Sequence, residues 1–358
     1  MSFSTRLLEW YAEKGRSLPW RETHDPYVVW VTEIILQQTR IDQGIDYYFR
    51  FLEAFPDVSR LAAAPEDEVL RLWQGLGYYS RARNLHRAAR EIVEKGGGQL
   101  PGSYAEWLKV PGVGPYTAAA IASIAFGEAV PALDGNVYRV LARVFGIAES
   151  TEKGAGKKVF REVASGLIDR EDPGAFNQAM MDFGAMVCKP AAPLCPDCIF
   201  NRECLALQQD AVDQYPVKKA PKAIRNRYFN YFFFFFEDQE GQQQFLVRQR
   251  DGKDIWKNLY ELPLIETAEE AGPEKVFEMP QWKNWFPDKK ELTWTGQPLS
   301  FRHVLTHQVI HAKFYAVRLP PEKALTLAEE FFLVDEKAFE RLPKSRLTLL
   351  FLQRNMKK

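Results

Sequence analysis

All four cysteines of this 358-residue chain lie between positions 188 and 204, in the spacing C-x6-C-x2-C-x5-C. They are Cys188, Cys195, Cys198 and Cys204. Four thiols so close in sequence are typical of a site for one metal ion or one iron–sulfur cluster, and the spacing leaves zinc and iron–sulfur both open. Because no other cysteine remains, a scattered disulfide framework is excluded. Thiolate ligands need a reducing compartment, so we expect the protein in the cytoplasm.

The texture of the sequence changes after the cysteines, and a chain of this length favours two domains over one. From residue 5 to about 210, apolar residues recur at helical spacing. Later segments are rich in β-branched and aromatic residues, and we expect strands at 228–237, 244–250, 301–306 and 309–317 and a closing helix at 347–353. We therefore predict a mainly α part over 1–213, a basic linker over 214–227 and an α+β domain over 228–358.

The charges balance, with 47 basic and 47 acidic residues, so the total charge neither favours nor excludes a nucleic-acid partner. The linker carries five basic residues with no acid between them: Lys218, Lys219, Lys222, Arg225 and Arg227. They fit either a solvated linker or a contact with phosphates. The first residues lack the apolar stretch of a secretory signal, and the most apolar run, 228–236, is too short to span a bilayer.

Residues 108–118 read LKVPGVGPYTA, with Gly112 and Gly114 on either side of a valine. Two glycines allow a tight turn that directs successive N–H groups outward at the start of a helix, which makes a binding site for an anion. We expect Gly114 to cap that helix and Pro115 to be its first residue. The segment can also be an ordinary connection between helices, but the full string favours a grip on a DNA phosphate.

Two carboxylates suit chemistry at a sugar bond. Asp134 precedes a helix that we expect to end near Phe145; it is either a plain N-cap or an ionised group whose pKa the helix N-terminus lowers. Glu33 lies on a helix opened by Asp25 and is followed by three apolar residues. It is either a partly exposed surface residue or a buried acid with a raised pKa. One protonated and one ionised carboxyl are typical of glycosidic-bond cleavage.

These segments together resemble the adenine DNA glycosylases of the endonuclease III superfamily, the MutY type. The resemblance rests on residues 31–39, 73–85, 108–118 and 133–137 and on the cysteine spacing. It implies two helical lobes with a helix–hairpin–helix motif, a [4Fe–4S] cluster on the four cysteines and a Nudix-like C-terminal domain. Members that also cleave the DNA strand carry a lysine where this chain has Tyr116, so the resemblance implies a monofunctional glycosylase.

The same resemblance implies a role for each matching residue. Glu33 would protonate adenine N7, and Asp134 would stabilise the deoxyribose cation, with Tyr116 and Asn136 holding both carboxyls in place. The pocket for the flipped adenine would include Trp20, Arg21, Leu36 and Gln178, while Gln38, Thr39 and Tyr78 would probe and wedge the base stack. Without the resemblance, Tyr78 reads as a core aromatic residue.

In the C-terminal part, residues 256–263 resemble the W-x-x-L-x-E-x-P strand of the Nudix-like domain. The glutamate run that would bind Mg²⁺ does not follow, so we expect recognition without hydrolysis. Many bacterial members read 8-oxoguanine with a Phe-Ser-His triplet, and this chain has Leu305, Thr306 and His307 there. The threonine keeps a hydroxyl able to hydrogen-bond the lesion.

We therefore expect a monomeric, nucleoid-associated DNA glycosylase of base excision repair that removes adenine paired with 8-oxoguanine or guanine in double-stranded DNA. Three alternatives stay open: a thymine–guanine mismatch glycosylase of the same superfamily, a Nudix-type hydrolase of damaged nucleotides, and a lesion-binding protein without catalysis.

Overall fold

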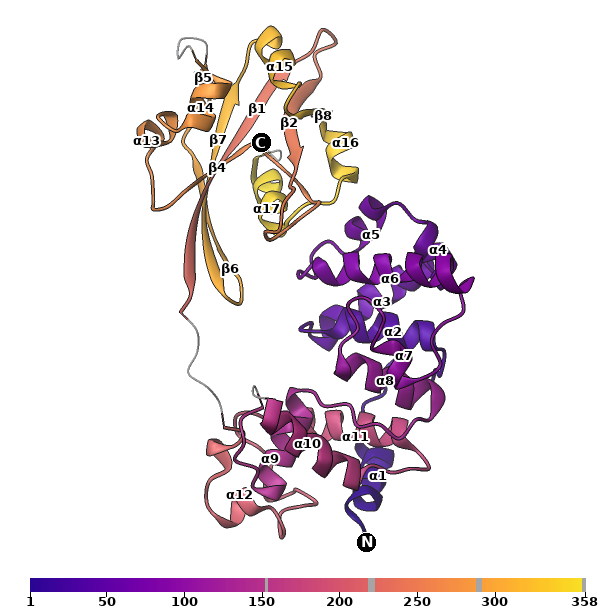
Figure 1. Cartoon of the computed structure of the whole chain (residues 1–358). Coiled ribbons are helices and arrows are strands. Elements are labelled where there is room, and N and C mark those ends of the chain that lie inside the picture. Colours follow the sequence, from indigo (N-terminus) through magenta and orange to yellow (C-terminus); the bar gives the residue numbers. More distant parts are fainter. Residues whose placement is uncertain (152–153, 218–222, 288–291, 356–358) are drawn as a thin grey trace. The chain divides into compact units, whose positions relative to one another are not determined.

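The computed structural model describes residues 1–151, 154–217, 223–287 and 292–355. By its internal contacts the chain divides into two compact units, Met1–Ala63 with Asn84–Ala220 and Ala64–Arg83 with Pro221–Lys358 (Figure 1). The segment 64–83 therefore belongs by its contacts to the second unit, although it lies inside the predicted helical part. No helix in the described ranges is long and apolar enough to cross a membrane.

The first unit is built from helices. Its elements are α1 (Phe3–Lys14), α2 (Pro26–Leu36), α3 (Ile41–Ala54), α4 (Val58–Ala63), most of α6 (Ser80–Gly96), α7 (Tyr104–Trp107), α8 (Pro115–Phe126), α9 (Gly135–Phe145), α10 (Gly154–Leu167), α11 (Pro173–Met186), α12 (Leu205–Gln208) and the 3-10 turn η1 (Val212–Gln214). Local sequence sets their ends. Asp25 caps α2 by accepting from the Tyr27 N–H at 2.8 Å, with proline at the first helical position. Gly127 and Gly146 end α8 and α9 in the left-handed conformation.

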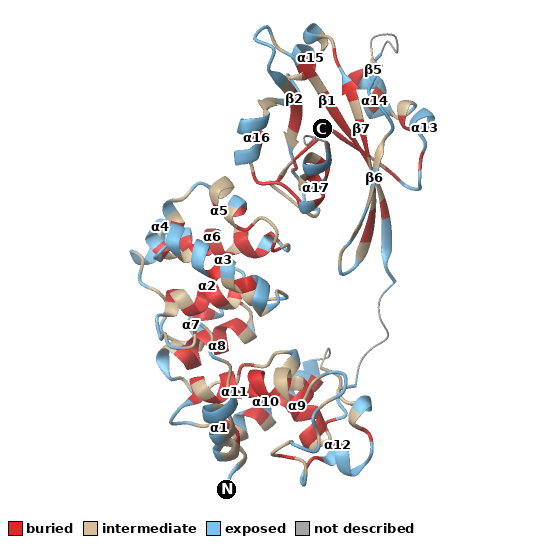
Figure 2. Cartoon of the chain, turned by 180° about the vertical axis from the view of Figure 1, so that it is seen from behind, coloured by how far each residue is buried: buried red, intermediate tan, exposed pale blue. Residues whose placement is uncertain are grey.

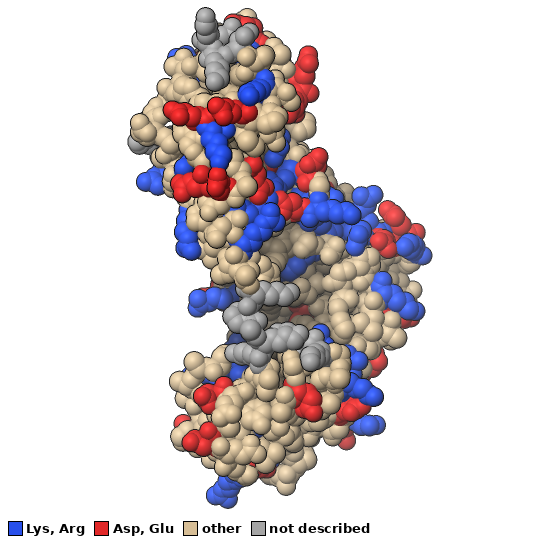
Figure 3. Space-filling view, turned by 60° about the vertical axis from the view of Figure 1, so that its left-hand side comes forward, with Lys and Arg blue, Asp and Glu red and all other residues tan. Residues whose placement is uncertain are grey.

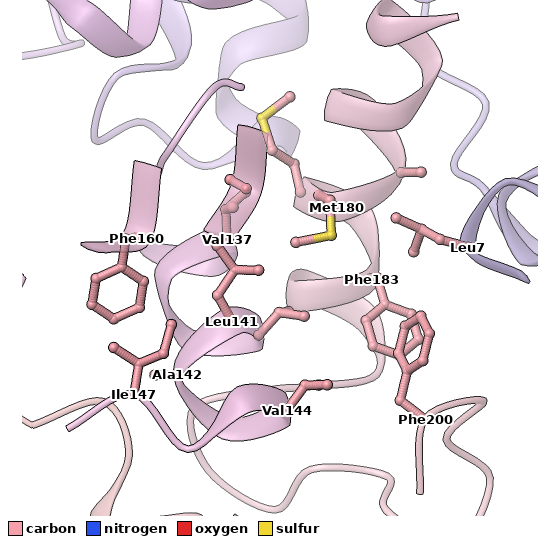
Figure 4. Packing of buried hydrophobic residues seen from close by; sticks show 14 of the residues in the cluster. Leu7, Val137, Leu141, Ala142, Val144, Ile147, Phe160, Met180, Phe183 and Phe200 are labelled. Atoms are coloured by element: carbon pink, nitrogen blue, oxygen red, sulfur yellow. The ribbon is translucent and has the colours of Figure 1, made fainter. Parts of the chain in front are cut away.

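Helices α9 and α11 pack closely in the core shown in Figure 4, where Leu7 of α1 and Phe200 also contribute side chains. One glycine permits this close approach. A Cβ placed on Gly184 of α11 would lie 2.6 Å from the Cβ and 3.0 Å from the carbonyl carbon of Asn136 at the start of α9. Because Gly184 has no side chain, α11 can approach the start of α9 closely at Asn136.

The second unit is a mixed sheet with helices on both faces (Figure 1). Its strands are β1 (Arg225–Glu237), β2 (Gln243–Gln249), β3 (Tyr260–Glu261), β4 (Leu264–Thr267), β5 (Thr293–Trp294), β6 (Leu299–Val304), β7 (Gln308–Arg318) and β8 (Phe332–Asp335). Its helices are α5 (Glu66–Leu72), α13 (Pro273–Phe277), α14 (Pro280–Trp285), α15 (Pro321–Leu327), α16 (Glu336–Arg341) and α17 (Arg346–Asn355). The main path of the sheet runs β3-β2-β1-β7-β5, and β1 and β7 pair in parallel.

The aromatic run of β1 explains the two-sided core. Alternate side chains point to opposite faces of a strand, so Phe232 and Phe234 pack with Trp282 and Trp285 on one face, under α14. Tyr231 and Phe233 face the other way. They pack there with residues of α16 and α17, and Figure 2 shows β1 and β7 buried over much of their length. A strand covered on both faces reads as a continuous apolar run, which is what 228–236 is.

The predicted fold class, helices followed by an α+β part, is confirmed. The four predicted strands correspond to β1, β2, β6 and β7, and each end lies within three residues of the prediction. The basic run predicted as linker is partly wrong, because Arg227 lies in β1 with only 4% of its surface exposed. It forms ion pairs with Asp254 and Glu266 at 2.6 Å each, so it is not available to a phosphate. Lys218, Lys219 and Lys222 lie outside the described residues.

On the face shown in Figure 3, basic and acidic side chains are interspersed, in keeping with the balanced total charge. Some of the basic side chains are neutralised by ion pairs with acidic ones, as Arg227 is by Asp254.

Replacing Gly184 with alanine should destabilise the protein by about 1–3 kcal/mol, because the new methyl group meets the Asn136 backbone and not a side chain that can move. Denaturant unfolding measures the effect. Gly166 in α10 gives the matched control, since a Cβ there meets nothing within 4 Å. Gly166→Ala should stabilise the helix by about 0.5–1 kcal/mol. Equal effects of the two substitutions would contradict the close-packing argument.

Candidate active site

A cavity of about 740 Å³ in the first unit brings together residues from segments far apart in the sequence. Twelve residues singled out from the sequence line it: Trp20, Arg21, Glu33, Leu36, Gln38, Thr39, Gly112, Gly114, Tyr116, Asp134, Asn136 and Gln178. The volume is ample for one purine base with its sugar. The cavity therefore gathers the two carboxyls, the hairpin glycines and the polar residues of the predicted base pocket around one space.

Asp134 reaches the cavity as the N-cap of α9. Its Oδ1 accepts from the Val137 N–H at 2.8 Å, and its Oδ2 accepts from Asn136 Nδ2 at 2.8 Å. Arg139 in turn donates to Asn136 Oδ1 at 2.8 Å, which fixes the orientation of the amide. Asp134 is thus the N-cap of α9, as one of the two sequence interpretations had it, and it also faces the cavity.

The direction predicted for the pKa of Asp134 is wrong. Burial raises this pKa, and the hydrogen bonds from Val137 and Asn136 and the charge of Arg139 only partly offset the rise. The sequence revealed the helix N-terminus but not the depth of the cavity. Asp134 nonetheless accepts two well-formed hydrogen bonds that stabilise its charged form.

Burial also raises the pKa of Glu33, as predicted, although the side chain is partly open to the cavity. A hydrogen bond from Tyr116 and the charge of Arg21 lower the pKa, and the charge of Asp134 raises it. The Tyr116 hydroxyl also lies 3.0 Å from Met181 Sδ. It has one hydrogen to donate, and an ionised carboxylate is a stronger acceptor than a thioether, so we assign that hydrogen to Glu33 whenever Glu33 is charged.

The two carboxyls thus differ in their hydrogen bonds rather than in the direction of their pKa shifts. Asp134 receives a backbone N–H and an amide N–H, which favour its ionised form against the effect of burial. Glu33 stands on α2 among the buried residues Ile34 and Ile35, where an uncharged form is favoured. Such a pair can protonate one part of a substrate and stabilise positive charge on another.

The predicted hairpin forms between α7 and α8. Gly112 has φ +79°, which a residue with a side chain rarely adopts, and a Cβ there would lie 2.6 Å from the Cβ of Asn84. Gly114 caps α8, and Pro115 is its first residue, as the sequence predicted. The hairpin therefore packs its backbone against α6 and leads into the N-terminus of α8, where N–H groups can meet an anion.

Two of the residues expected to probe the base stack have unusual backbones. Gln38 has φ 56° and Tyr78 has φ 46°, in the region that disfavours residues other than glycine. Tyr78 is 43% exposed, so the interpretation as a core residue is wrong for it, whereas the neighbouring Tyr79 is buried. Within the second unit the Tyr78 hydroxyl hydrogen-bonds the Thr306 hydroxyl. Thr306 and His307 are both exposed.

The four cysteines line one small cavity next to Arg143. The Phe200 N–H donates to Cys198 Sγ at 3.4 Å, and Arg143 Nη1 lies 3.5 Å from Cys188 Sγ. Burial, together with the charges of the other three thiols, raises the pKa of Cys198 to about 11. In the described part of the chain, no group of three or more His, Cys, Asp or Glu side chains is arranged to hold a single metal ion.

The segment that resembles a Nudix strand is mostly a loop, with φ 59° at Trp256 and 64° at Asn258. Only Tyr260 and Glu261 form the short strand β3. Glu261 is 3% exposed and accepts from both Arg248 and Arg250. The two arginines hold this carboxylate, so it is not free to bind Mg²⁺.

Sequence reasoning missed four residues at or behind the cavity: Tyr11, Arg16, Met181 and Asp182. Asp182 carries the strongest signal, since it is the one charged residue of helix α11 and is fully buried. A charge at such a position indicates a specific partner.

Two known families match the chain. Residues 31–164 match the HhH-GPD superfamily of base excision DNA repair proteins, and residues 234–354 match the NUDIX domain. The adenine DNA glycosylase of Buchnera aphidicola (from Acyrthosiphon pisum) is 32% identical over 320 residues, which cover 89% of this chain and 87% of that protein.

Two further similarities cover a smaller share of the chain. The adenine DNA glycosylase of Homo sapiens is 44% identical over 223 residues, 60% of this chain and 41% of that protein. Among solved structures, a thermostable thymine-DNA glycosylase superposes with a TM-score of 0.53 at 30% identity and covers 58% of this chain and 95% of its own.

The raised pKa of Glu33 predicts a gain in stability for Glu33→Gln at high pH. A carboxyl with a folded-state pKa above its unfolded value makes the protein lose stability as pH rises through that window, and glutamine makes no such loss. Unfolding free energies should be equal below about pH 4 and favour the variant at pH 8. Glu53→Gln, on the exposed face of α3, gives the control. A variant less stable than the parent at pH 8 would contradict the assignment.

Proposed function

The chain belongs to the adenine DNA glycosylase family, and we propose that it removes adenine paired with 8-oxoguanine or guanine from double-stranded DNA. Its enzyme class, a DNA glycosylase of base excision repair, follows from the family. The observation that carries the finer proposal is the pair of unlike carboxyls, Glu33 and Asp134, facing one cavity of purine size. We further propose that the protein acts as a monomer in the cytoplasm, where it associates with the nucleoid.

In the proposed reaction, Glu33 donates its proton to N7 of the flipped adenine. The C1′–N9 bond then breaks, and both of its electrons leave with the base. The Asp134 carboxylate faces the positive charge that develops on the sugar, and Asn136 and the Val137 N–H hold it in place. Water adds to C1′, and Glu33, now ionised, takes the released proton. Tyr116 stabilises that charged form through its hydroxyl.

The lack of lysine at position 116 supports a hydrolytic enzyme without a Schiff-base step, since the phenol of Tyr116 cannot form one. Trp20, Leu36 and Gln178 supply an apolar wall and an amide at the cavity, which suits a purine with acceptor nitrogens. Gly112 and Gly114 would receive a phosphate beside it.

Recognition of the opposite strand falls to the second unit in this proposal. Tyr78 is exposed, and its hydroxyl contacts Thr306 beside the exposed His307. An aromatic ring suits a wedge in the base stack, and the threonine hydroxyl can both donate to and accept from a lesion. The leucine at 305 is partly buried, which supports a packing role under the turn.

A thymine–guanine glycosylase is the second candidate, because the solved thymine-DNA glycosylase shares the helical fold at 30% identity. That likeness covers 58% of the chain, and 121 residues of the chain, from 234 to 354, match a NUDIX domain. The full-length relative at 87% coverage is an adenine glycosylase, so adenine is the preferred base.

For the cysteines we propose a [4Fe–4S] cluster, held by Cys188, Cys195, Cys198 and Cys204. Four thiols around one cavity, with N–H donors from Phe200 and Arg143 pointing at two of the sulfurs, suit a cluster ligated by thiolates. The cluster would stabilise the loop between residues 188 and 204, and no step of the base excision passes through it.

A single-turnover assay on defined duplexes tests the function. We expect adenine release opposite 8-oxoguanine and guanine and none of thymine opposite guanine. Glu33→Gln should reduce the rate by about 10²–10⁴-fold, because the proton donor is lost, while duplex binding is retained. Glu53→Gln serves as the control. Thymine release would favour the second candidate, and a normal rate for Glu33→Gln would remove Glu33 from the mechanism.

The purified protein should be brown and contain about four iron atoms per chain. Cys198→Ser should lose the colour and the iron and lower the unfolding temperature, because one ligand of the cluster is missing. Asp197→Asn, an exposed neighbour in the same loop, should keep both. Colourless protein that contains one zinc ion per chain would replace the iron–sulfur assignment with a zinc site.

A further inference from the structure

One fully buried carboxylate behind the cavity has no part in the reaction described so far. Asp182 of α11 is 0% exposed and contacts two arginines that line the cavity, Arg16 and Arg21. The Arg16 N–H donates to its Oδ2 at 2.9 Å and Arg16 Nε to its Oδ1 at 3.0 Å. Arg21 Nη2 donates to the same Oδ1 at 2.9 Å. These hydrogen bonds compensate the Asp182 charge, because a buried carboxylate without partners would strongly destabilise the fold.

Arg21 continues the network toward the base pocket. Its Nη1 lies 3.4 Å from the Tyr11 hydroxyl, which donates to Gln178 Oε1 at 2.8 Å. Because arginine can only donate, the hydrogen bonds run in one direction, from Arg21 through Tyr11 to the Gln178 oxygen. The Nε2 end of the Gln178 amide is thereby turned away from Tyr11, as a donor for an acceptor nitrogen of a base.

Arg21 also acts on the acid. Its charge lowers the pKa of Glu33 and that of Tyr116, against the rise that burial causes in both. Other charged or titratable groups that face Glu33 are Tyr116 from α8 and Asp134 at the start of α9. Arg16 lines the same cavity. The position of the Arg21 guanidinium therefore affects how firmly Glu33 holds its proton.

One donor of Arg21 is unused. Within the described residues, its Nε–H is buried without a hydrogen-bond partner. A fixed, buried guanidinium with a spare donor beside the acid suits a role in orienting a ligand. Its orientation is set by Asp182 on one side and Tyr11 on the other, so neither the guanidinium nor the Gln178 amide is free to turn.

We propose that Asp182 is a positioning residue: it holds Arg21 so that one guanidinium both orients the base through Tyr11 and Gln178 and keeps its charge at the cavity that Glu33 also lines. The inference rests on the proposed function for its effect on catalysis. Its effect on Glu33 is a property of the folded protein alone. Asp182 touches neither the base nor the sugar and acts through Arg21.

The test is Asp182→Asn, which keeps the shape but removes the charge that holds two arginines. Base release at saturating enzyme should fall by about 10- to 100-fold, because the base is held less well. The alkaline limb of the pH–rate profile, where Glu33 loses its proton, should move to higher pH, since a loosened Arg21 lowers the pKa of Glu33 less. Arg21→Met should move the limb in the same direction, and the double variant no further than either.

A second readout does not need activity. The pH at which the stability advantage of Glu33→Gln over its parent stops growing should be higher, and that advantage larger, in the Asp182→Asn background than in the wild type. This readout separates failure of the inference from failure of the proposed function, which the base-release assay on the wild type tests. Should Asp182→Asn not fold, Arg21→Lys keeps the charge but loses the planar fork, and should move both quantities in the same direction.

Glu261→Gln is the matched control, as Glu261 is another buried carboxylate paired with two arginines, in the second unit. It should lower stability and leave the alkaline limb unchanged. An Asp182→Asn profile that is lowered equally at every pH would mean a merely structural role and would overturn the inference. Movement of the alkaline limb to lower pH in Asp182→Asn would also overturn it. The same holds if the double variant shifts the limb by the sum of the shifts of Asp182→Asn and Arg21→Met.

Discussion

Removal of carboxyl groups from water is the constraint on which the catalytic unit depends. Burial raises the pKa of both Glu33 and Asp134, and such desolvation is tolerated only where neighbours supply hydrogen bonds. Asp134 obtains them from the end of α9 and from Asn136. Glu33 obtains fewer hydrogen bonds, and the remaining cost of desolvation favours its protonated form. The buried Glu33 thus lowers the stability of the folded protein at the position where the proposed reaction needs a proton donor.

The packing of the helices serves this constraint. Asn136 can support Asp134 because Gly184 lets α11 approach the start of α9, and Arg139 fixes the Asn136 amide from behind. Arg139 also donates to the Gly184 carbonyl at 2.7 Å, so the close contact between the helices and the orientation of the amide depend on one side chain. A change in either helix therefore reaches the carboxylate without touching it.

Features that depend on local sequence pattern were predicted, whereas features that depend on burial by distant segments were missed. Caps, the hairpin and the alternation of the aromatic run in β1 follow from residue types at fixed spacing, and they were predicted with small errors at the ends. The direction of the Asp134 pKa was wrong because solvent exclusion is set by segments distant in sequence. Arg227 was taken for a free linker charge because its partners, Asp254 and Glu266, are 27 and 39 residues away. Asp182 was missed for the same reason, since both of its arginines lie on the N-terminal side of the chain.

The likeness to a thymine-DNA glycosylase and the relationship to adenine glycosylases concern different levels of the structure. The helical scaffold, with a hairpin for phosphate and a carboxylate at the start of a helix, suits removal of either base, because the charge that develops on the sugar is the same. The choice of base must then reside in the groups around the cavity. A purine presents an acceptor nitrogen that can be protonated before the bond breaks, and a buried acid such as Glu33 is useful only for a base of that kind. In the proposed reaction, the protonation state of Glu33 therefore bears on both the rate and the choice of base.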